Sequence, residues 1–254
     1  MGIAARDLDR DGTDEVFLSS MGDQRLMRRD GPGAAFVDAP YSLGTSAHRP
    51  YTGGDGRPST GWHISFGDIQ NDGRDDVFIS KGNVQQMPGS AMEDPNNLLI
   101  QQADGTFAEY GSQAGIEDLL SKGRGAALVD FDGDGRLDLA VLNRGAPLQV
   151  WHNQSACTGG WLSVDLRMQS PNTHAIGAWI EITAGSEVQS REVTIGGGHA
   201  GGASVAQHFG LGLAENARMR VKWPHGAWSD WTDIDRNQRI RVMPSEAGLK
   251  ITAY

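Results

Sequence analysis

The stretch LVDFDGDGRLDLAVLN, residues 128–143, decides how the rest of the sequence is interpreted. An acidic loop opens it, with carboxylates at positions 1, 3, 5 and 9 and glycine at position 6: Asp130, Asp132, Asp134, Asp138 and Gly135. Alternate carboxylates point inward when such a loop curls around a cation, and glycine permits the sharp turn. The apolar run 139–141 follows directly and predicts a buried strand.

The same pattern occurs twice more upstream, as ARDLDRDGTDEVFLSS (5–20) and FGDIQNDGRDDVFISK (66–81). The first aspartates of the three loops, Asp7, Asp68 and Asp130, are 61 and 62 residues apart. Each copy is followed by a second strand-like segment. A period near 60 residues exceeds a hairpin and is typical of a four-stranded propeller blade with long connections. The sequence therefore predicts an all-β chain that opens with a partial β-propeller.

Oxygen-only ligation of this kind favours Ca²⁺, which takes about six to eight oxygen ligands. The predicted ligands, at positions 1, 3, 5, 7 and 9, are Asp7, Asp9, Asp11, Thr13 and Glu15; Asp68, Gln70, Asp72, Arg74 and Asp76; and Asp130, Asp132, Asp134, Arg136 and Asp138. Position 7 would contribute only its backbone carbonyl oxygen. Up to three Ca²⁺ ions are expected. Because Gln70 replaces a carboxylate by an amide, we expect the second site to be the weakest.

The sequence disfavours two other interpretations of the loops. An EF-hand requires a bidentate Glu at position 12, but that position is Leu18, Ile79 or Val141, each within a predicted strand. Solvated Asp-rich turns without metal are disfavoured because several carboxylates this close would repel one another in all three copies. The metal is expected to be structural, since protein carboxylates would fill most of its coordination sphere.

The C-terminal region has a different character. Residues 156–254 hold nine acidic and nine basic side chains, so the whole net charge of −10 lies in residues 1–155. Residues 160–245 alternate in polarity in the manner of half-buried strands, as in Leu162, Val164 and Leu166. We therefore expect propeller blades over 1–155 and a small all-β sandwich or barrel of six to eight strands over 156–254. The only helical segment expected is short, near 113–122.

Other motifs give weaker signals. The segment GGGHAGG at 196–202 lacks the Lys-Ser/Thr ending and following helix of a phosphate loop, so a turn is the better interpretation. Trp223, Trp228 and Trp231 fit core or interdomain packing better than a carbohydrate platform. No G-x-S-x-G nucleophile motif occurs, and no catalytic residue is predicted.

Composition also excludes several classes of protein. The acidic balance argues against a nucleic-acid partner, which requires a basic face. No apolar run approaches the roughly 18 residues that a membrane span needs. The single cysteine, Cys157, rules out an intrachain disulfide. The N-terminal segment MGIAARDLDRDG lacks the apolar core of a signal peptide.

The repeated D-x-D-x-D-G-x-x-D loops, each followed by an apolar strand, resemble FG-GAP/VCBS repeats. The C-terminal region resembles the ASPIC/UnbV domain, on marks at 161–162, 175–178, 191–193, 208–212 and 221–224. The two together are similar to the cartilage acidic protein family, which has many bacterial members. The resemblance implies β-propeller blades with Ca²⁺ in the loops. It also implies a secreted, periplasmic or cell-surface location, and a propeller of more than three blades.

These observations lead to two functional hypotheses. The favoured one is a calcium-binding, exported module for cell adhesion or for binding a protein or glycan. We expect additional polypeptide to complete the propeller, because three blades alone leave blade faces uncovered. The alternative is an enzyme, either hydrolytic or biosynthetic as the enediyne-locus origin of the UnbV name implies, with structural calcium and chemistry in a propeller funnel. A pocket with a perturbed acid or base away from the loops would favour the enzyme.

Overall fold

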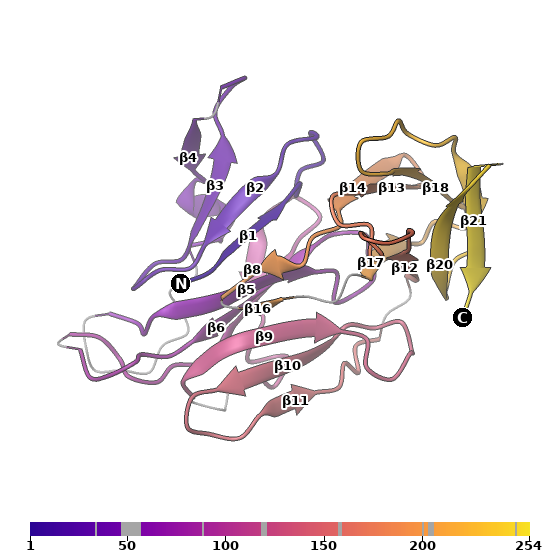
Figure 1. Ribbon diagram of the computed structural model, residues 1–254. Coiled ribbons are helices and arrows are strands. Elements are labelled where there is room, and N and C mark those ends of the chain that lie inside the picture. The colour runs from indigo at the N-terminus through magenta and orange to yellow at the C-terminus, as the bar shows by residue number, and fades with distance from the viewer. Residues whose placement is uncertain are drawn as a thin grey trace.

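The first part of the chain forms three antiparallel sheets in succession, each built from consecutive strands (Figure 1). We call them blades 1, 2 and 3. Blade 1 contains β1 (Ile3–Arg6), β2 (Glu15–Leu18), β3 (Arg25–Arg29) and β4 (Phe36–Asp38). Blade 2 contains β5 (Gly61–Gly67), β6 (Asp76–Lys81), β7 (Asn97–Gln101) and β8 (Phe107–Glu109). Blade 3 contains β9 (Gly123–Val129), β10 (Asp138–Asn143) and β11 (Gln149–Trp151).

The structure is a computed structural model. It describes residues 1–33, 35–46, 57–87, 89–117, 121–156, 159–199, 201–202, 206–246 and 248–254. Cys157 and part of the expected 113–122 helix lie outside these ranges.

The blades pack face to face through the apolar runs that the sequence places after each loop. Blades 1 and 2 bury one cluster, which includes Phe17 and Leu26 from blade 1 and Val77, Ile79 and Leu99 from blade 2. Blades 2 and 3 bury a second cluster, which includes Phe78, Leu98 and Ile100 from blade 2 and Leu139 and Val141 from blade 3. Strand β6 thus uses alternate side chains for its two neighbours, Val77 and Ile79 for blade 1 and Phe78 for blade 3, as a sheet buried on both faces requires.

The C-terminal part is a sandwich of two four-stranded sheets. One sheet has the order β17 (Gln207–Gly212), β12 (Gly160–Leu166), β20 (Gln238–Ser245), β21 (Gly248–Ala253). The other has the order β14 (Glu187–Glu192), β13 (Trp179–Ala184), β18 (Ala217–Lys222), β19 (Thr232–Ile234). A single core lies between them, with Leu162, Val164 and Leu166 facing Ile180 and Ile182. The expected alternation in this region is confirmed.

A short glycine hairpin of the C-terminal part makes contact with blade 1. β15 (Gly196–Gly197) pairs with β16 (Gly201–Gly202), so the glycine-rich segment is a turn, as expected. Ile3 and Gly198 exchange backbone hydrogen bonds of 3.2 and 3.1 Å. The C-terminal region therefore covers part of the free edge of β1.

The expected all-β fold of propeller blades followed by a sandwich is confirmed, but the expected helix at 113–122 is wrong over its described part. Residues 111–115 form a turn instead, in which the Ala114 N–H donates to the Tyr110 oxygen at 2.9 Å. Gly115 then adopts the left-handed conformation (φ 70°), and Ile116 is buried in the cluster between blades 2 and 3. Residues 118–120 lie outside the described part.

Among the described residues, the one helical element is a 3-10 turn, Tyr41–Leu43. Within the described residues, no helix has the length and apolar character needed to cross a membrane.

Candidate metal centres

Each acidic loop connects the first two strands of its blade and has the same backbone shape. Position 6 is left-handed in all three, at Gly12 (φ 85°), Gly73 (φ 92°) and Gly135 (φ 86°). Position 4 is left-handed as well, at Arg10 (φ 63°), Asn71 (φ 55°) and Gly133 (φ 87°). The glycine at position 6 thus serves the turn for which the sequence predicted it. Position 4 accepts Arg10 at a steric cost of about 1–2 kcal/mol, and Asn71 at a smaller cost because Asn tolerates the left-handed region.

Backbone hydrogen bonds fix the carboxylates at the two ends of each loop. The position 1 carboxylate accepts from the position 6 N–H, at 3.0 Å for Asp7, 2.7 Å for Asp68 and 3.0 Å for Asp130. The position 9 carboxylate accepts from the position 2 N–H, at 2.8 Å for Glu15, 2.9 Å for Asp76 and 3.0 Å for Asp138. The ends of the loop are therefore drawn together by its own amides.

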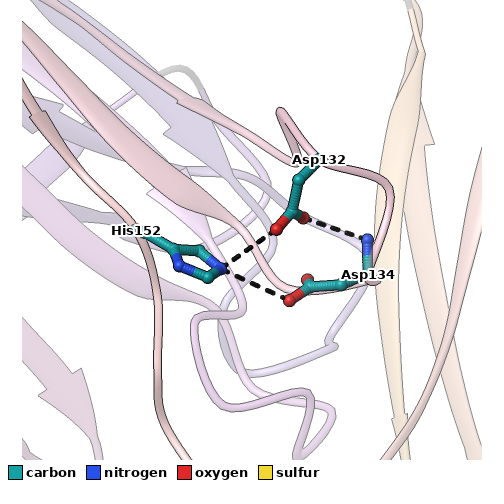
Figure 2. A group of neighbouring side chains, drawn as sticks. All are labelled: Asp132, Asp134 and His152. Carbon is teal, nitrogen blue, oxygen red and sulfur yellow. Dashed lines mark hydrogen bonds and ion pairs between the residues drawn. The ribbon is translucent and has the colours of Figure 1, made fainter.

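This curl brings positions 1, 3 and 9 together in two of the three loops. Carboxylate oxygens of Asp7, Asp9 and Glu15 lie within 4.8 Å of one another, as do those of Asp130, Asp132 and Asp138. Among the described residues, the second loop gives no such group of three, because its position 3 is Gln70. Asp134 instead approaches Asp132 and His152 (Figure 2).

The remaining predicted ligands turn toward the loop backbone. The position 5 carboxylates Asp11, Asp72 and Asp134 accept from the N–H of position 7 at 2.7, 3.0 and 2.8 Å. At position 7, the side chain of Arg74 pairs with Asp72 and that of Arg136 pairs with Asp134. In the first loop, position 7 is Thr13, which has a neutral side chain in place of the arginine.

The first loop contains a buried carboxylate oxygen, Asp7 Oδ1, that has no hydrogen-bond partner. Burial raises the pKa of Glu15 to about 7, and the neighbouring acids Asp9, Asp7 and Asp11 add to the shift. Buried acceptors normally have partners, and a divalent cation held by the oxygens of this loop would supply one. The residues of the first loop therefore fit Ca²⁺.

In the third loop, an arginine and a histidine lie beside the acids. Arg239 lies 2.9 Å from Asp130 Oδ2, and His152 lies 3.1 Å from Asp132 Oδ2. Hydrogen bonds and charge from Arg239, with bonds from Gly133 and Gly135, outweigh burial and lower the pKa of Asp130. In the second loop, burial raises the pKa of Asp68 to about 7, with the nearby charges of Asp72 and Asp75 contributing.

These pKa shifts predict how the stability of the metal-free protein changes with pH. Glu15 and Asp68 hold their protons up to about pH 7 in the folded state, against ordinary values of 4.5 and 3.8. Between these values the folded state binds more protons than the unfolded state, so the free energy of unfolding falls as pH rises from about 4 to 7. Urea unfolding in metal-free buffer measures this. Glu15→Gln should flatten the curve, and a free energy that rises across the window would contradict the prediction.

Comparison with known proteins finds two matching stretches in the chain. The FG-GAP-like repeat matches residues 7–79, and the ASPIC and UnbV family matches residues 168–249. The chain thus contains one stretch that matches FG-GAP-like repeats and one that matches the ASPIC/UnbV domain.

Its relatives include proteins named cartilage acidic protein 1. The one from Mus musculus is 28% identical over 237 residues, which is 89% of this chain and 34% of the relative. Those from Xenopus tropicalis and Homo sapiens are 35% and 32% identical over 40% and 41% of this chain, and 13% of each relative. The chain therefore spans about a third or less of the length of these relatives.

The ASPIC/UnbV region touches all three acidic loops, which the sequence did not predict. The side chain of Arg10 pairs with Glu187 at the first loop, and Arg191 pairs with Asp75 at the second. Also at the second loop, His208 Nε2 lies 2.8 Å from Asn71 Oδ1. Burial lowers the pKa of His208 to about 4, so this histidine is neutral. Arg239 completes the set at the third loop.

A cavity of about 360 Å³ lies where the first two loops meet β14. Its lining includes Arg6, Arg10, Arg74, Asp75 and Arg191. These charged groups are paired: Asp75 lies 3.0 Å from Arg191 and 3.4 Å from Arg6, and Arg10 and Arg74 pair with Glu187 and Asp72. The cavity borders the loops, and two of its groups with shifted pKa values, Asp75 and Arg191, pair with each other.

The tryptophans that could have formed a carbohydrate platform make cation–π contacts instead. The guanidinium of Arg220 lies 4.5 Å from the ring centre of Trp228 and 4.7 Å from that of Trp231. Trp223 packs against the sandwich core. These contacts support the packing interpretation of the sequence.

Proposed function

We propose that the chain is a calcium-binding module of an exported protein, in which Ca²⁺ in the FG-GAP loops stabilises a surface that binds a protein or glycan. The convergence of positions 1, 3 and 9 carries the proposal, together with the buried, unpartnered Asp7 Oδ1. The calcium is structural, because the loops also form the contact between the blades and the ASPIC/UnbV region. Similarity to proteins named cartilage acidic protein 1 supports an extracellular setting.

Calcium is expected to raise the melting temperature of the chain. Modules of this ligand type bind at about 0.1–1 mM, so millimolar calcium stabilises each occupied site by roughly 1 kcal/mol. Asp7→Asn and Asp132→Ala should each remove about one site's increment. Gln70→Ala should remove less, because Gln70 brings no charge. The measurement is thermal melting in calcium and in chelator.

Asp104→Asn is the matched control for this experiment. Asp104 is an exposed turn aspartate that caps Thr106 outside the three loops. Its replacement should leave the calcium increment unchanged. Equal melting temperatures of the unmodified chain in calcium and chelator would refute the proposal.

The exposed face of blade 3 supports a further part of the proposal, namely that additional polypeptide completes the propeller. Strand pairing makes Ala140 and Val150 of blade 3 equivalent to Phe78 and Leu98 of blade 2, which pack on the next blade. In blade 3 this face is open, and Leu142, Leu148 and Val150 are each 59% exposed. The proposed occupant is another sheet of the same repeat type, with branched aliphatic side chains opposite these residues.

This surface can be tested on the chain alone. With blade 3 uncovered, the chain should bind a hydrophobic dye or self-associate with increasing concentration, as measured by sedimentation. Val150→Lys should reduce both effects. A monodisperse monomer that binds no dye, with or without the substitution, would contradict the proposed contact.

A further inference from the structure

The third loop differs from the other two in a side chain that lies outside the loop itself. In each blade, one residue of the third strand pairs with the residue that directly follows the position 9 acid on the second strand. These third-strand residues are Met27, Leu99 and Trp151. The residues that follow them are Arg28, Ile100 and His152. Arg28 lies 3.1 Å from Asp9, the position 3 acid of its loop, just as His152 lies 3.1 Å from Asp132. Equivalent positions in blades 1, 2 and 3 thus hold a guanidinium, an aliphatic side chain and an imidazole, respectively.

Of these three side chains, only the imidazole can ligate a metal. His152 Nε2 lies 3.1 Å from Asp132 Oδ2 and 3.6 Å from Asp134 Oδ2, and all three atoms point into one space (Figure 2). Zinc bonds nitrogen and carboxylate oxygen at about 2.0–2.2 Å, so tetrahedral ligands lie roughly 3.3–3.5 Å apart. The two measured separations lie on either side of that range.

We propose that Asp132, Asp134 and His152 form a mixed nitrogen and oxygen site for Zn²⁺ on the outer side of the third loop. Imidazole suits zinc and related first-row metals, whereas calcium takes oxygen ligands. His152 is half exposed, so the fourth position is open to water. The side chain of Arg136 pairs with the same oxygen, Asp134 Oδ2, so zinc would share that oxygen with the guanidinium. Asp132 also belongs to the calcium group, so calcium and zinc compete for it.

The simpler alternative is that His152 only balances the charge of Asp132, as Arg28 does for Asp9. The chain itself offers the variant that separates the two roles. His152→Arg reproduces the arrangement of the first loop, because it places a guanidinium beside Asp132 but removes the ligand. Arg28→His makes the reverse change and gives the first loop the third loop's arrangement, with Asp9 and Asp11 in the roles of Asp132 and Asp134.

The test is calorimetric titration of the calcium-free chain with Zn²⁺, alongside visible absorption on titration with Co²⁺. The unmodified chain should bind one Zn²⁺ that His152→Arg weakens by at least about tenfold, since even outer-shell changes cost 10- to 100-fold. Arg28→His should add a second equivalent. His225→Arg, at an exposed histidine far from the loops in sequence, is the matched control and should change neither value.

Two results would overturn the proposal. One is zinc affinity in His152→Arg within about threefold of that in the unmodified chain. The other is an equal loss in His225→Arg, which would indicate adventitious binding by surface histidines. If His152→Arg does not fold, as judged by circular dichroism, His152→Gln provides the same comparison with a neutral side chain. Because the titration contains no calcium, its outcome is separate from that of the calcium melting experiment.

Discussion

Replacing Asp75 by alanine is expected to lower the free energy of unfolding by about 3–5 kcal/mol, the usual cost of removing one partner from a buried ion pair. Asp75 accepts from Arg191 Nη2 at 3.0 and 3.2 Å and lies 3.4 Å from Arg6 Nε. The side chains of Asp75 and Arg191 are 10% and 4% exposed. Without Asp75, two guanidinium groups would face each other in a poorly solvated space.

The pKa values of the pair agree with this picture. Burial alone would raise the pKa of Asp75, but the charges of Arg191 and Arg6 outweigh it, so the net shift is downward. Burial lowers the pKa of Arg191 to about 10, partly offset by Asp75. The Asp75 carboxylate therefore compensates the positive charges of Arg191 and Arg6 in the interface.

Urea unfolding of the full chain measures the effect of Asp75→Ala. The double variant Asp75→Ala with Arg191→Met should recover part of the loss, because it removes one of the stranded charges. Asp230→Ala, at an exposed aspartate, is the control and should stay within about 0.5 kcal/mol of the unmodified chain. If Asp75→Ala costs less than about 1 kcal/mol, the interface does not depend on this pair.

The sequence was sufficient to predict the repeating part of the fold because that part rests on local rules. Apolar runs such as 77–79 follow each loop and become the strands β2, β6 and β10, of which β6 is buried on both faces. Glycine at position 6 marks the turn, and spacing alone brings positions 1, 3 and 9 together in the first and third loops. In the sandwich, alternation places Leu162, Val164 and Leu166 in one core.

The partners of the loops could not be predicted, because they come from distant parts of the chain. Asp75 at position 8 looks like one more acid of the second loop, and only the fold shows that it faces Arg191, 116 residues away. Arg239 and His152 likewise reach the third loop through tertiary packing and strand pairing. The helix expected at 113–122 failed for a related reason, since the burial of Ile116 between two blades outweighs local helix propensity.

The close approach of Gly210 to the second loop leads to the other prediction with a large effect. A Cβ at Gly210 would lie 1.8 Å from Asp68 Oδ2 and 2.8 Å from the Cα of Asn71. The Gly210 carbonyl also accepts from Gln189 Nε2 at 2.6 Å, so the strand cannot shift away without losing that bond. The backbone of β17 must therefore lie directly against the position 1 carboxylate.

Gly210→Ala is expected to lower the free energy of unfolding by about 1–3 kcal/mol, the usual cost of overpacking. It should also reduce any calcium increment from the second loop, because Asp68 must move. Gly196→Ala is the matched control: Gly196 is also in a strand, and a Cβ there would meet no atom within 4 Å. Urea unfolding of both variants, with and without calcium, measures the difference. Equal stability of the two would mean that the ASPIC/UnbV region does not rest on the second loop, and the coupling of calcium loops to that region would have to be abandoned.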